Sequence, residues 1–491
     1  MDWKTPLIFE LSRAGRHNKA LDPEVTAVNP WQDLPAELLR NERAPLPELS
    51  ELQVVRHFTR LSQKNYSIDT APYPLGSCTM KYNPKIAHDL AGLEGFSSRH
   101  PLASESSGQG LMSCLYELQE ALANITGMQA TCLSPMAGAQ GEFAGVAMIR
   151  AYHHHHGDEQ RDEILVPDAA HGTNPASATM CGYKVREIPT ASNGDLDLEV
   201  LKQTTGARTA GIMLTNPSTL GLFERQIESI RDIIHGAGGL MYYDGANLNA
   251  IMGIASPARM GFDIMHINLH KTFATPHGCG GPGAGPIAMT EAMLPYRPIP
   301  FVIREGETYR WASSVDVPHS IGRLSAFMGN IGVLLRAYVY IRLLGAQGLK
   351  RVAQHSVLNA NFLMQCLRQA GLDLPYKDRR CAHEFIVSLE QLAGDYKVSA
   401  LDAAKRLLDY GIHAPTVYFP LLVPECMLFE PTETETREDM ERLANTLVEI
   451  VTESQENPEL LQSSPHSMPI GRLDEVHAAR HPDLVWQESG T

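Results

Sequence analysis

Short apolar runs alternate with helical stretches between residues 160 and 270, and this alternation predicts the core of the chain. Apolar runs that end at polar residues predict buried strands at Glu163–Pro167, Lys184–Pro189, Ala210–Leu214, Leu240–Tyr243 and Phe262–Leu269. Helical periodicity between these runs predicts helices at Leu196–Thr204 and Ile227–His235. Strands that alternate with helices at this spacing indicate an α/β fold with a mostly parallel sheet covered on both faces.

The pattern changes on either side of this core. Residues 1–60 are rich in proline and charge, and a helix is expected only near Ser50, a plausible N-cap. Further helices are predicted at Leu111–Ile125, Arg437–Ser454 and Leu473–Arg480, and Ser320–Leu344 is predicted to be one buried helix or a pair of helices. From about Gly348 amphipathic helices mix with short strands, EFIVSL and TVYFPL, as in a smaller α+β domain. We therefore predict an N-terminal arm (1–65), a large domain (66–325), a small C-terminal domain (326–455) and a tail (456–491).

Composition narrows the possible functions. The 491 residues are 43% hydrophobic and 20% charged, and the net charge of −15 comes without a basic patch, so nucleic acid is not an expected partner. The apolar stretches are too interrupted to cross a bilayer, so no membrane association is expected. The start of the chain resembles neither a signal peptide nor a transit peptide, and we expect a cytoplasmic location.

Cysteine and histidine usage gives no sign of a metal centre. The eight cysteines are scattered and never form a CxxC pair, which indicates reduced thiols rather than a disulfide framework or a zinc site. Four consecutive histidines, His153–His156, would point in different directions on a helix. We expect a solvated helix end there rather than a metal site.

The stretch from Gly238 to Pro286 carries the most specific chemistry. Asp244 and Lys271 each follow an apolar run, and open α/β sheets bind ligands beyond the carboxyl ends of their strands. A lysine amine that bonds to an aldehyde, with a carboxylate that pairs with a pyridinium nitrogen, suits pyridoxal 5'-phosphate. The glycine-rich run Gly278–Gly285 lets backbone approach a ligand closely. The alternative is a surface lysine and a helix-capping aspartate.

Two further segments fit the same site. The small residues Ala137–Gly141 lead into a predicted helix, whose free N–H groups and dipole form a natural seat for phosphate. His171 follows another strand, where an imidazole could stack on a flat cofactor ring or serve a structural role. Residues 70–84 form a loop dense in turn residues, for which a functional loop and a plain connector are equally supported.

Several long motifs are spread over almost the whole chain: PLGSCTMKYNP, PDAAHGTNPASA, MLTNPSTLGLFE, YYDGANLNAI, NLHKTFATPHGCGGPGAGP, CAHEFIVS, PTVYFPLLVPECMLFEPTETET and RLDEVHAAR. Together they resemble the P-protein of the glycine cleavage system, glycine decarboxylase. The length and the segment PLIFELSRAGR are similar to the lysine-bearing chain of the two-chain bacterial form. The chain departs from the family pattern at Cys279, where glycine is usual, and at Ser218, where asparagine is usual.

The resemblance implies a fold type I PLP-dependent enzyme, aspartate aminotransferase-like. By motif, Lys271 is the Schiff-base lysine, Asp244 binds the pyridine nitrogen, Ala246 packs beneath the ring and His171 stacks on its other face. The remaining residues that the resemblance places at the cofactor are Gly138, Ala139 and Gln140 at the phosphate, with Thr173 and Thr215 near the phenolic oxygen and the sheet edge. His270 would assist proton transfer or stack, and a structural role is equally supported.

The family's activity is decarboxylation of glycine with transfer of the aminomethyl group to the lipoyl arm of H-protein. The resemblance also implies a partner, subunit 1 of the two-chain form, with two copies of each subunit. Two alternatives are another fold type I enzyme acting alone, such as an aminotransferase or a cysteine desulfurase, and a non-catalytic scaffold. Cys381 and Cys426 lie in apolar settings that do not favour a desulfurase, and retained Lys271 and Asp244 argue against a scaffold.

Overall fold

The computed structural model describes residues 5–16, 34–40, 44–277 and 283–486, so Cys279 lies outside the described residues. The chain forms two compact units, one from residues 1–70 and 466–491 and one from residues 71–465. Within the first unit the two ends of the chain meet: the Phe9 ring stacks on Trp486 at 4.7 Å, and Tyr66 Oη lies 3.8 Å from Met468 Sδ. The four-part division drawn from the sequence stays a prediction.

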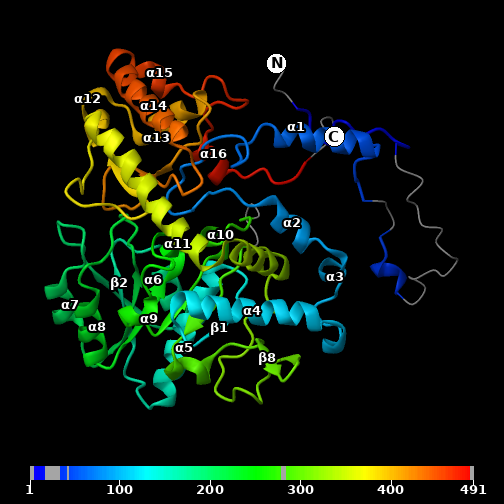
Figure 1. Ribbon diagram of the computed structural model, residues 1–491. Helices are drawn as coiled ribbons and strands as arrows, with labels where there is room; N and C mark the ends of the chain where they lie inside the picture. The colour runs from blue at the N-terminus through cyan, green and yellow to red at the C-terminus, as the bar shows by residue number, and fades with distance from the viewer. Residues whose placement is uncertain (1–4, 17–33, 41–43, 278–282, 487–491) are drawn as a thin grey trace. The chain divides into compact units, whose positions relative to one another are not determined.

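A seven-stranded sheet forms the centre of the second unit (Figure 1). The strand order is β1-β7-β6-β5-β4-β2-β3, and only β7 runs antiparallel to its neighbours. The strands are β1 (Ala130–Cys132), β2 (Glu163–Pro167), β3 (Lys184–Ile188), β4 (Thr209–Thr215), β5 (Leu240–Asp244), β6 (Ile264–His266) and β7 (Ile287–Met289). The predicted α/β class with a mostly parallel sheet is confirmed.

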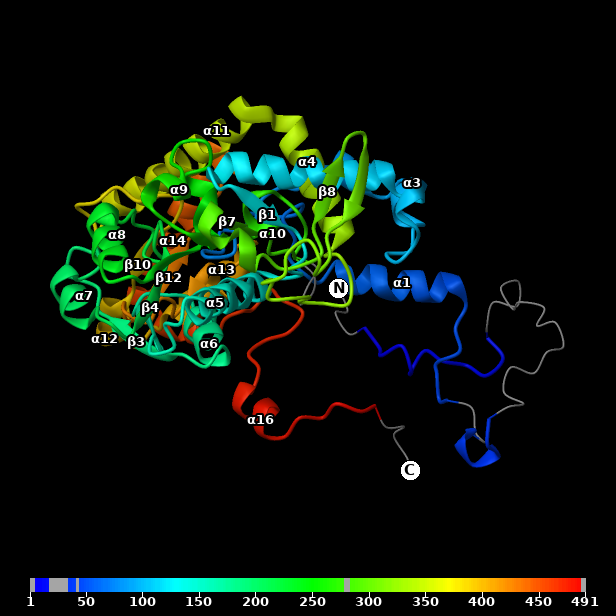
Figure 2. The ribbon, with the colours of Figure 1, turned by 90° about the horizontal axis from the view of Figure 1, so that it is seen from below.

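Helices cover both faces of this sheet, because side chains that alternate along each strand enter different cores. Tyr242 belongs to one buried cluster and Tyr243 to the other. The Tyr242 face packs on α5 (Gly138–His155) and α6 (Thr173–Met180), which lie together in Figure 2. The helices that contribute to the Tyr243 cluster are α4 (Gln109–Thr126), α7 (Leu198–Thr204), α8 (Ile227–Gly236), α9 (Pro257–Met260) and α11 (Ile331–Gln369).

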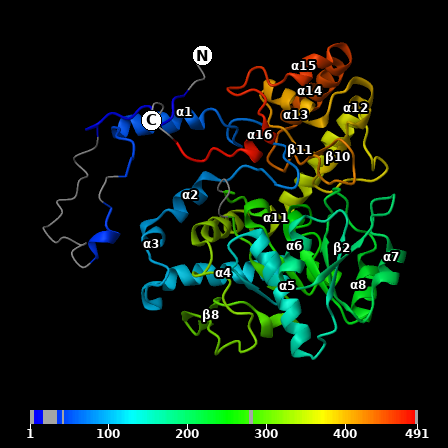
Figure 3. The same cartoon turned by 180° about the vertical axis from the view of Figure 1, so that it is seen from behind.

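A smaller α+β region follows in the same unit (Figure 3). Its antiparallel sheet has the order β10-β12-β11, and the second half of α11 packs against its core. Its elements are β10 (Phe385–Ser388), α12 (Glu390–Tyr396), α13 (Ala400–Asp409), β11 (Thr416–Val417), β12 (Cys426–Phe429), α14 (Arg437–Glu456) and α15 (Pro458–Gln462). The other elements of the described chain are η2 (Ala36–Leu38), α1 (Glu51–Ser62), α2 (Lys85–Ala91), α3 (Glu94–Ser97), η3 (Glu105–Ser107), η4 (Gly245–Ala250), α10 (Leu269–Thr272), η5 (Glu291–Tyr296), β8 (Val302–Glu305), β9 (Thr308–Trp311) and α16 (Glu475–Arg480).

Three predicted elements differ from the observed ones in where they begin or end. The helix expected from Ser320 begins only at Ile331, because Gly322 and Gly329 adopt positive φ values of 87° and 103° that a helix does not contain. The strand expected at Phe262–Leu269 covers only β6, since Leu269 already starts α10. TVYFPL contributes two residues to β11. Apolar runs alone do not show where such an element ends.

Capping residues in the sequence correctly predicted where two other helices begin or end. Ser50 caps α1 and forms a capping box with Gln53, and α4 ends at Gly127, whose φ is 75°. No helix within the described part of the chain is both long enough and apolar enough to cross a membrane.

Candidate active site

The carboxyl ends of the parallel strands gather the polar side chains that the sequence singles out. Asp244 is the last residue of β5 and lies opposite Thr215, the last residue of β4. His171 follows the end of β2. Because these ends share one edge of the sheet, segments far apart in the sequence meet there.

Asp244 is a buried carboxylate surrounded by donors, with 1% of its surface exposed. Its Oδ2 accepts hydrogen bonds from His171 Nδ1 at 2.7 Å, Asn174 Nδ2 at 3.2 Å and Thr215 Oγ1 at 3.1 Å, while Oδ1 accepts one from the Ala246 N–H at 3.0 Å. Burial alone would raise the pKa of Asp244, but its interactions with His171, then His266 and Lys271, outweigh burial and hold the pKa below its usual value. Asp244 is therefore an anion at neutral pH.

His171 connects Asp244 to the loop at residues 70–84. A carboxylate can only accept, so Nδ1 carries the hydrogen that bonds Asp244. On its other side Nε2 lies 2.7 Å from Ser77 Oγ, which donates to it in the neutral tautomer. The ring also stacks on Phe419 of the small region, with centroids 5.8 Å apart. The loop is thus part of the site, while stacking of His171 on a cofactor stays a prediction.

Lys271 lies in α10, five residues beyond the end of β6 rather than directly at a strand end. Among the described residues none accepts a hydrogen bond from its Nζ. Its charge acts to lower the pKa of Asp244, and it acts in the same direction on the pKa values of Glu142, Glu384 and Glu430. Lys271 is therefore the half-buried amine around which the ionisable groups of the site are arranged.

His270 next to it is a neutral imidazole. Burial, followed by the nearby His277 and Lys271, lowers its pKa to about 3. Its Nδ1 accepts the Ala284 N–H at 3.4 Å, and a Cβ at Gly283 would approach that nitrogen to 2.1 Å. The ring is thus held closely by the chain that returns from the glycine-rich run, of which positions 278–282 lie outside the described residues.

The start of α5 offers backbone N–H groups that no N-cap side chain of the described chain satisfies. The N-cap residue, Ala137, supplies no side-chain acceptor for the first turn, which contains Gly138, Ala139 and Gln140. A Cβ at Gly138 would meet Asn268 Oδ1 at 2.2 Å, so a larger residue there would displace the buried Asn268 side chain. The Gln140 side chain is already used, since it accepts the Met136 N–H and donates to the Leu324 carbonyl. The backbone rather than this side chain can hold an anion.

Of the two threonines that the sequence placed at the site, only one contacts Asp244. Thr215 contacts Asp244, whereas Thr173 begins α6 and its neighbour Asn174 makes the contact instead. The histidine run is not simply a solvated helix end: His153 is 2% exposed and bonds the Ala210 carbonyl, and His155 contacts Tyr296 Oη, while His154 is exposed. Packing of α5 against the sheet buries one side of the run.

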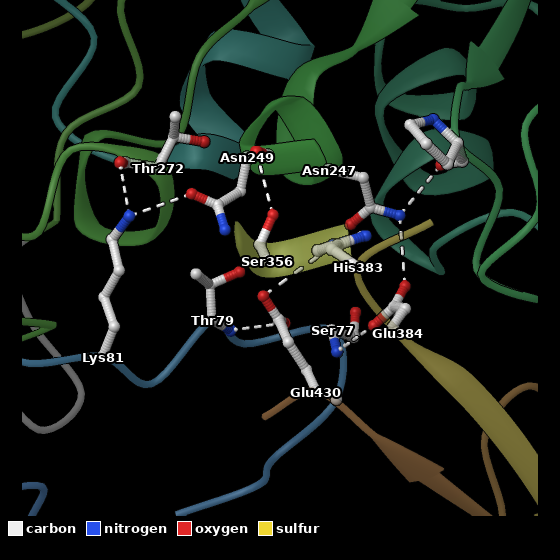
Figure 4. A network of polar contacts seen from close by, with 12 residues as sticks. Ser77, Thr79, Lys81, Asn247, Asn249, Thr272, Ser356, His383, Glu384 and Glu430 are labelled. Atoms are coloured by element: carbon white, nitrogen blue, oxygen red, sulfur yellow. Dashed lines mark hydrogen bonds and ion pairs between the residues drawn. The ribbon is translucent and has the colours of Figure 1, made fainter. Parts of the chain in front are cut away.

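The sequence reasoning missed two buried acids from the small region. Glu384 Oε2 accepts the Ser77 N–H at 2.7 Å, and Glu430 Oε2 accepts the Thr79 N–H at 3.0 Å (Figure 4). Ser77 and Thr79 both have positive φ, 65° and 44°, so the two carboxyls fasten a strained turn. The only signal was their presence in the motifs CAHEFIVS and MLFEPTETET, which says nothing about what they contact.

Comparisons with known proteins point to one family over almost the whole chain. Residues 29–303 match the family model described as glycine cleavage system P-protein, and residues 352–466 match the model described as glycine dehydrogenase, C-terminal domain. A protein of Methylococcus capsulatus named "Probable glycine dehydrogenase (decarboxylating) subunit 2" is 62% identical over 98% of both chains. A protein of Coxiella burnetii with the same name is 60% identical over 98% of this chain and 97% of its own.

Solved structures show the same fold. The chain resembles a glycine decarboxylase (P-protein) in inhibitor-bound form with a TM-score of 0.72 and 22% identity, over 86% of this chain and 94% of that one. It also resembles a NifS-like protein with a TM-score of 0.60 and 15% identity, over 78% of this chain and 99% of that one. At these identities the likeness concerns the fold alone.

Proposed function

The chain belongs to the glycine cleavage system P-protein family, and we propose that it is the lysine-bearing chain of a two-chain glycine decarboxylase. It would decarboxylate glycine, release CO2 and pass the aminomethyl group to the lipoyl arm of H-protein. The observation that carries the proposal is the buried Asp244 carboxylate beside a lysine amine with no hydrogen-bond partner among the described residues, in a chain 62% identical to a relative of that name.

The residues present fit pyridoxal 5'-phosphate. An amine without a partner suits the aldehyde, an anionic carboxylate suits the pyridinium nitrogen, and the first turn of α5 suits the phosphate. When bound, this cofactor supplies a ring that accepts the electrons released as the carboxylate leaves. Lys271 would hold the cofactor, Asp244 would keep its ring nitrogen protonated, and Gly138, Ala139 and Gln140 would bind the phosphate.

Other residues of the chain would set geometry and charge. Ala246 donates its N–H to Asp244 and would pack beneath the ring, and Thr215 and His171 fix the same carboxylate. Ser77, whose hydroxyl contacts His171, would contribute to the substrate side of the site. Thr173 and His270 remain weaker candidates for the phenolic oxygen and for proton transfer.

The partners follow from the names of the relatives. A chain that resembles "subunit 2" implies a partner subunit, and we propose subunit 1 of the two-chain form with two copies of each chain. The aminomethyl acceptor would be lipoylated H-protein.

A desulfurase acting alone is the less favoured function. It needs a reactive thiolate, whereas burial raises the pKa of Cys381 to about 12 and also raises that of Cys426.

Exchange of labelled bicarbonate into the carboxyl group of glycine tests the proposal. The chain would be assayed alone, with its candidate partner subunit, and with lipoylated H-protein added. Exchange in the complete mixture that Lys271→Ala abolishes supports the function. Absence of exchange in the complete, cofactor-loaded mixture would refute it, and transamination of other amino acids would then be screened.

A further inference from the structure

Three fully buried ionisable side chains of the small region form a cluster behind the Ser77–Thr79 turn (Figure 4). His383 and Glu384 precede β10, and Glu430 follows β12, which pairs with β10 through Phe385 and Phe429. Each of the three is 0% exposed, and one ligand atom of each lies within 4.8 Å of the others. The functions assigned above do not use this cluster.

The two carboxyls have few donors for their oxygens. Glu384 accepts from the Ser77 N–H and, at 3.2 Å, from Asn247 Nδ2. Glu430 accepts from the Thr79 N–H through Oε2, and its Oε1 makes no hydrogen bond within the described chain. Nε2 of His383 lies 3.9 Å from that oxygen, too far for a hydrogen bond. One carboxyl oxygen is therefore available to carry a hydrogen.

The charges that face the pair do not neutralise it. Lys81 lies nearby, but it is committed to Glu433 at 2.8 Å and to two further oxygens. Burial, followed by Lys271 and Lys81, lowers the pKa of His383 to about 3, so the imidazole is neutral. Cys78 faces the carboxyls with a pKa raised by burial. Lys271 thus remains the main positive group that approaches the pair from the large domain.

Two buried carboxyls this close do not both ionise readily. Burial, followed by repulsion from Glu430, raises the pKa of Glu384, and burial also raises the pKa of Glu430. The two carboxyls consequently titrate as one unit, in which burial and mutual repulsion favour a form that shares a proton.

Resting on the proposed function, we propose that Glu384 and Glu430 form a proton-holding pair and that Glu430 acts as the acid that protonates the sulfur leaving the lipoyl disulfide. The bond between the glycine α-carbon and its carboxylate breaks, and CO2 leaves. The electron pair left on carbon forms the bond to one lipoyl sulfur while the S–S bond breaks. The second sulfur keeps that bond's electron pair and takes the proton from Glu430, giving a thiol and a carboxylate, which solvent then reprotonates.

Infrared difference spectroscopy tests the proton without any need for activity. In D2O the carboxylic C=O band of the pair should be present at neutral pH and disappear as the pH is raised. This titration should be missing from Glu430→Gln, so it should appear in the difference between wild type and the variant. A pair that is already fully ionised at neutral pH would overturn the proposal. One equivalent of metal bound by His383, Glu384 and Glu430 in the purified protein would also overturn it.

The second measurement is the rate of thiol formation on H-protein by the complete assembly. Glu430→Gln should slow it about 100-fold, in the range general acids contribute, and should remove the fall of the wild-type rate at alkaline pH. Glu435→Gln is the matched control, because burial raises the pKa of Glu435 to about 7 but it is not among the groups that face Lys271. Wild-type rate and pH profile in Glu430→Gln would overturn the assignment.

Controls separate failure of the acid from other failures. Unchanged circular dichroism and cofactor absorbance would show that Glu430→Gln folds. If it does not fold, Glu384→Gln removes the repulsion within the pair and should lower the pH at which the remaining carboxylic C=O band disappears. A wild-type assembly that releases no CO2 would refute the proposed function, whereas the infrared result would still decide whether the pair holds a proton.

Discussion

Asp244 and the Glu384–Glu430 pair are buried almost equally and both lie near Lys271, yet their protonation differs. Asp244 receives four hydrogen bonds, one of them from His171, and its pKa falls. The pair shares three donors between two carboxyls that repel one another, and both pKa values rise. Burial sets the penalty for charge, and the neighbouring groups decide whether the penalty is overcome: His171, His266 and Lys271 overcome it at Asp244, whereas Glu430 adds to it at Glu384. One side of the site therefore favours an anion and the other a protonated carboxyl.

Removing the charge at Asp244 should have the largest effect. Asp244→Asn keeps the shape but cannot stabilise a protonated pyridine nitrogen, so we expect glycine–bicarbonate exchange to fall about 10³-fold. The measurement is exchange at saturating cofactor, with cofactor absorbance to show that binding persists. Asp162→Asn, at the opposite end of β2 in an exposed ion pair, is the control and should keep normal exchange. A loss below tenfold would show that the carboxylate is not needed as an anion.

The next largest effect is expected from replacing Lys81, because Lys81 is the buried cation that lies near Glu430 of the pair. Its Nζ donates to Asn249, the Thr272 carbonyl and Glu433, and its side chain is 1% exposed. Lys81→Met leaves Glu433 buried without its partner, so the free energy of unfolding should fall by about 3 kcal/mol. Urea unfolding measures this loss.

The matched control for that experiment is Lys184→Met, which removes an exposed ion pair with Asp162. It should change the free energy of unfolding by less than about 1 kcal/mol. If the two variants lose the same stability, the Lys81 network contributes no more than a surface pair. The double variant Lys81→Met/Glu433→Gln should recover part of the loss, since no unpaired charge then remains.

The sequence predicted that Asp244 belongs to the site, but it did not predict Glu384 and Glu430. Asp244 ends an apolar run, and strand ends in a parallel sheet meet at one edge, so its neighbourhood follows from the period of the pattern. Glu384 and Glu430 also adjoin short apolar runs, but they reach the site because a separate sheet packs near residue 77, more than 300 positions away in the chain. No periodicity encodes that contact.

The sequence pattern also failed to predict where some helices and strands begin and end, because tertiary packing decides these positions. Glycines that adopt positive φ interrupt the apolar stretch after Ser320, and α10 takes over the end of the predicted β6. Asn174 was missed although it stands beside Thr173 in the same motif, because only the orientation of α6 decides which of the two faces Asp244. Pattern gives the order of elements, and tertiary packing chooses among neighbouring side chains.

Glu142 tests the contrast most finely, because it is a lone buried acid beside Asp244. It is 6% exposed, its Oε2 has no partner within the described chain, and burial, then repulsion from Asp244, raises its pKa to about 9. A folded-state pKa above the unfolded value of 4.5 means that the neutral form is favoured. Its contribution to stability is therefore fully present below about pH 4.5 and is lost as the pH rises toward about 9.

Glu142→Gln removes this titration. Compared with wild type, the variant should gain about 1 kcal/mol of unfolding free energy per pH unit across that window, and little at acid pH. Urea unfolding at a series of pH values measures the difference, with Glu228→Gln on the first turn of α8 as a control that should follow wild type. A variant that parallels wild type from acid to alkaline pH would mean that Glu142 ionises inside the protein. Two anions would then stand side by side at the sheet edge, and donors near Asp244 would have to stabilise both.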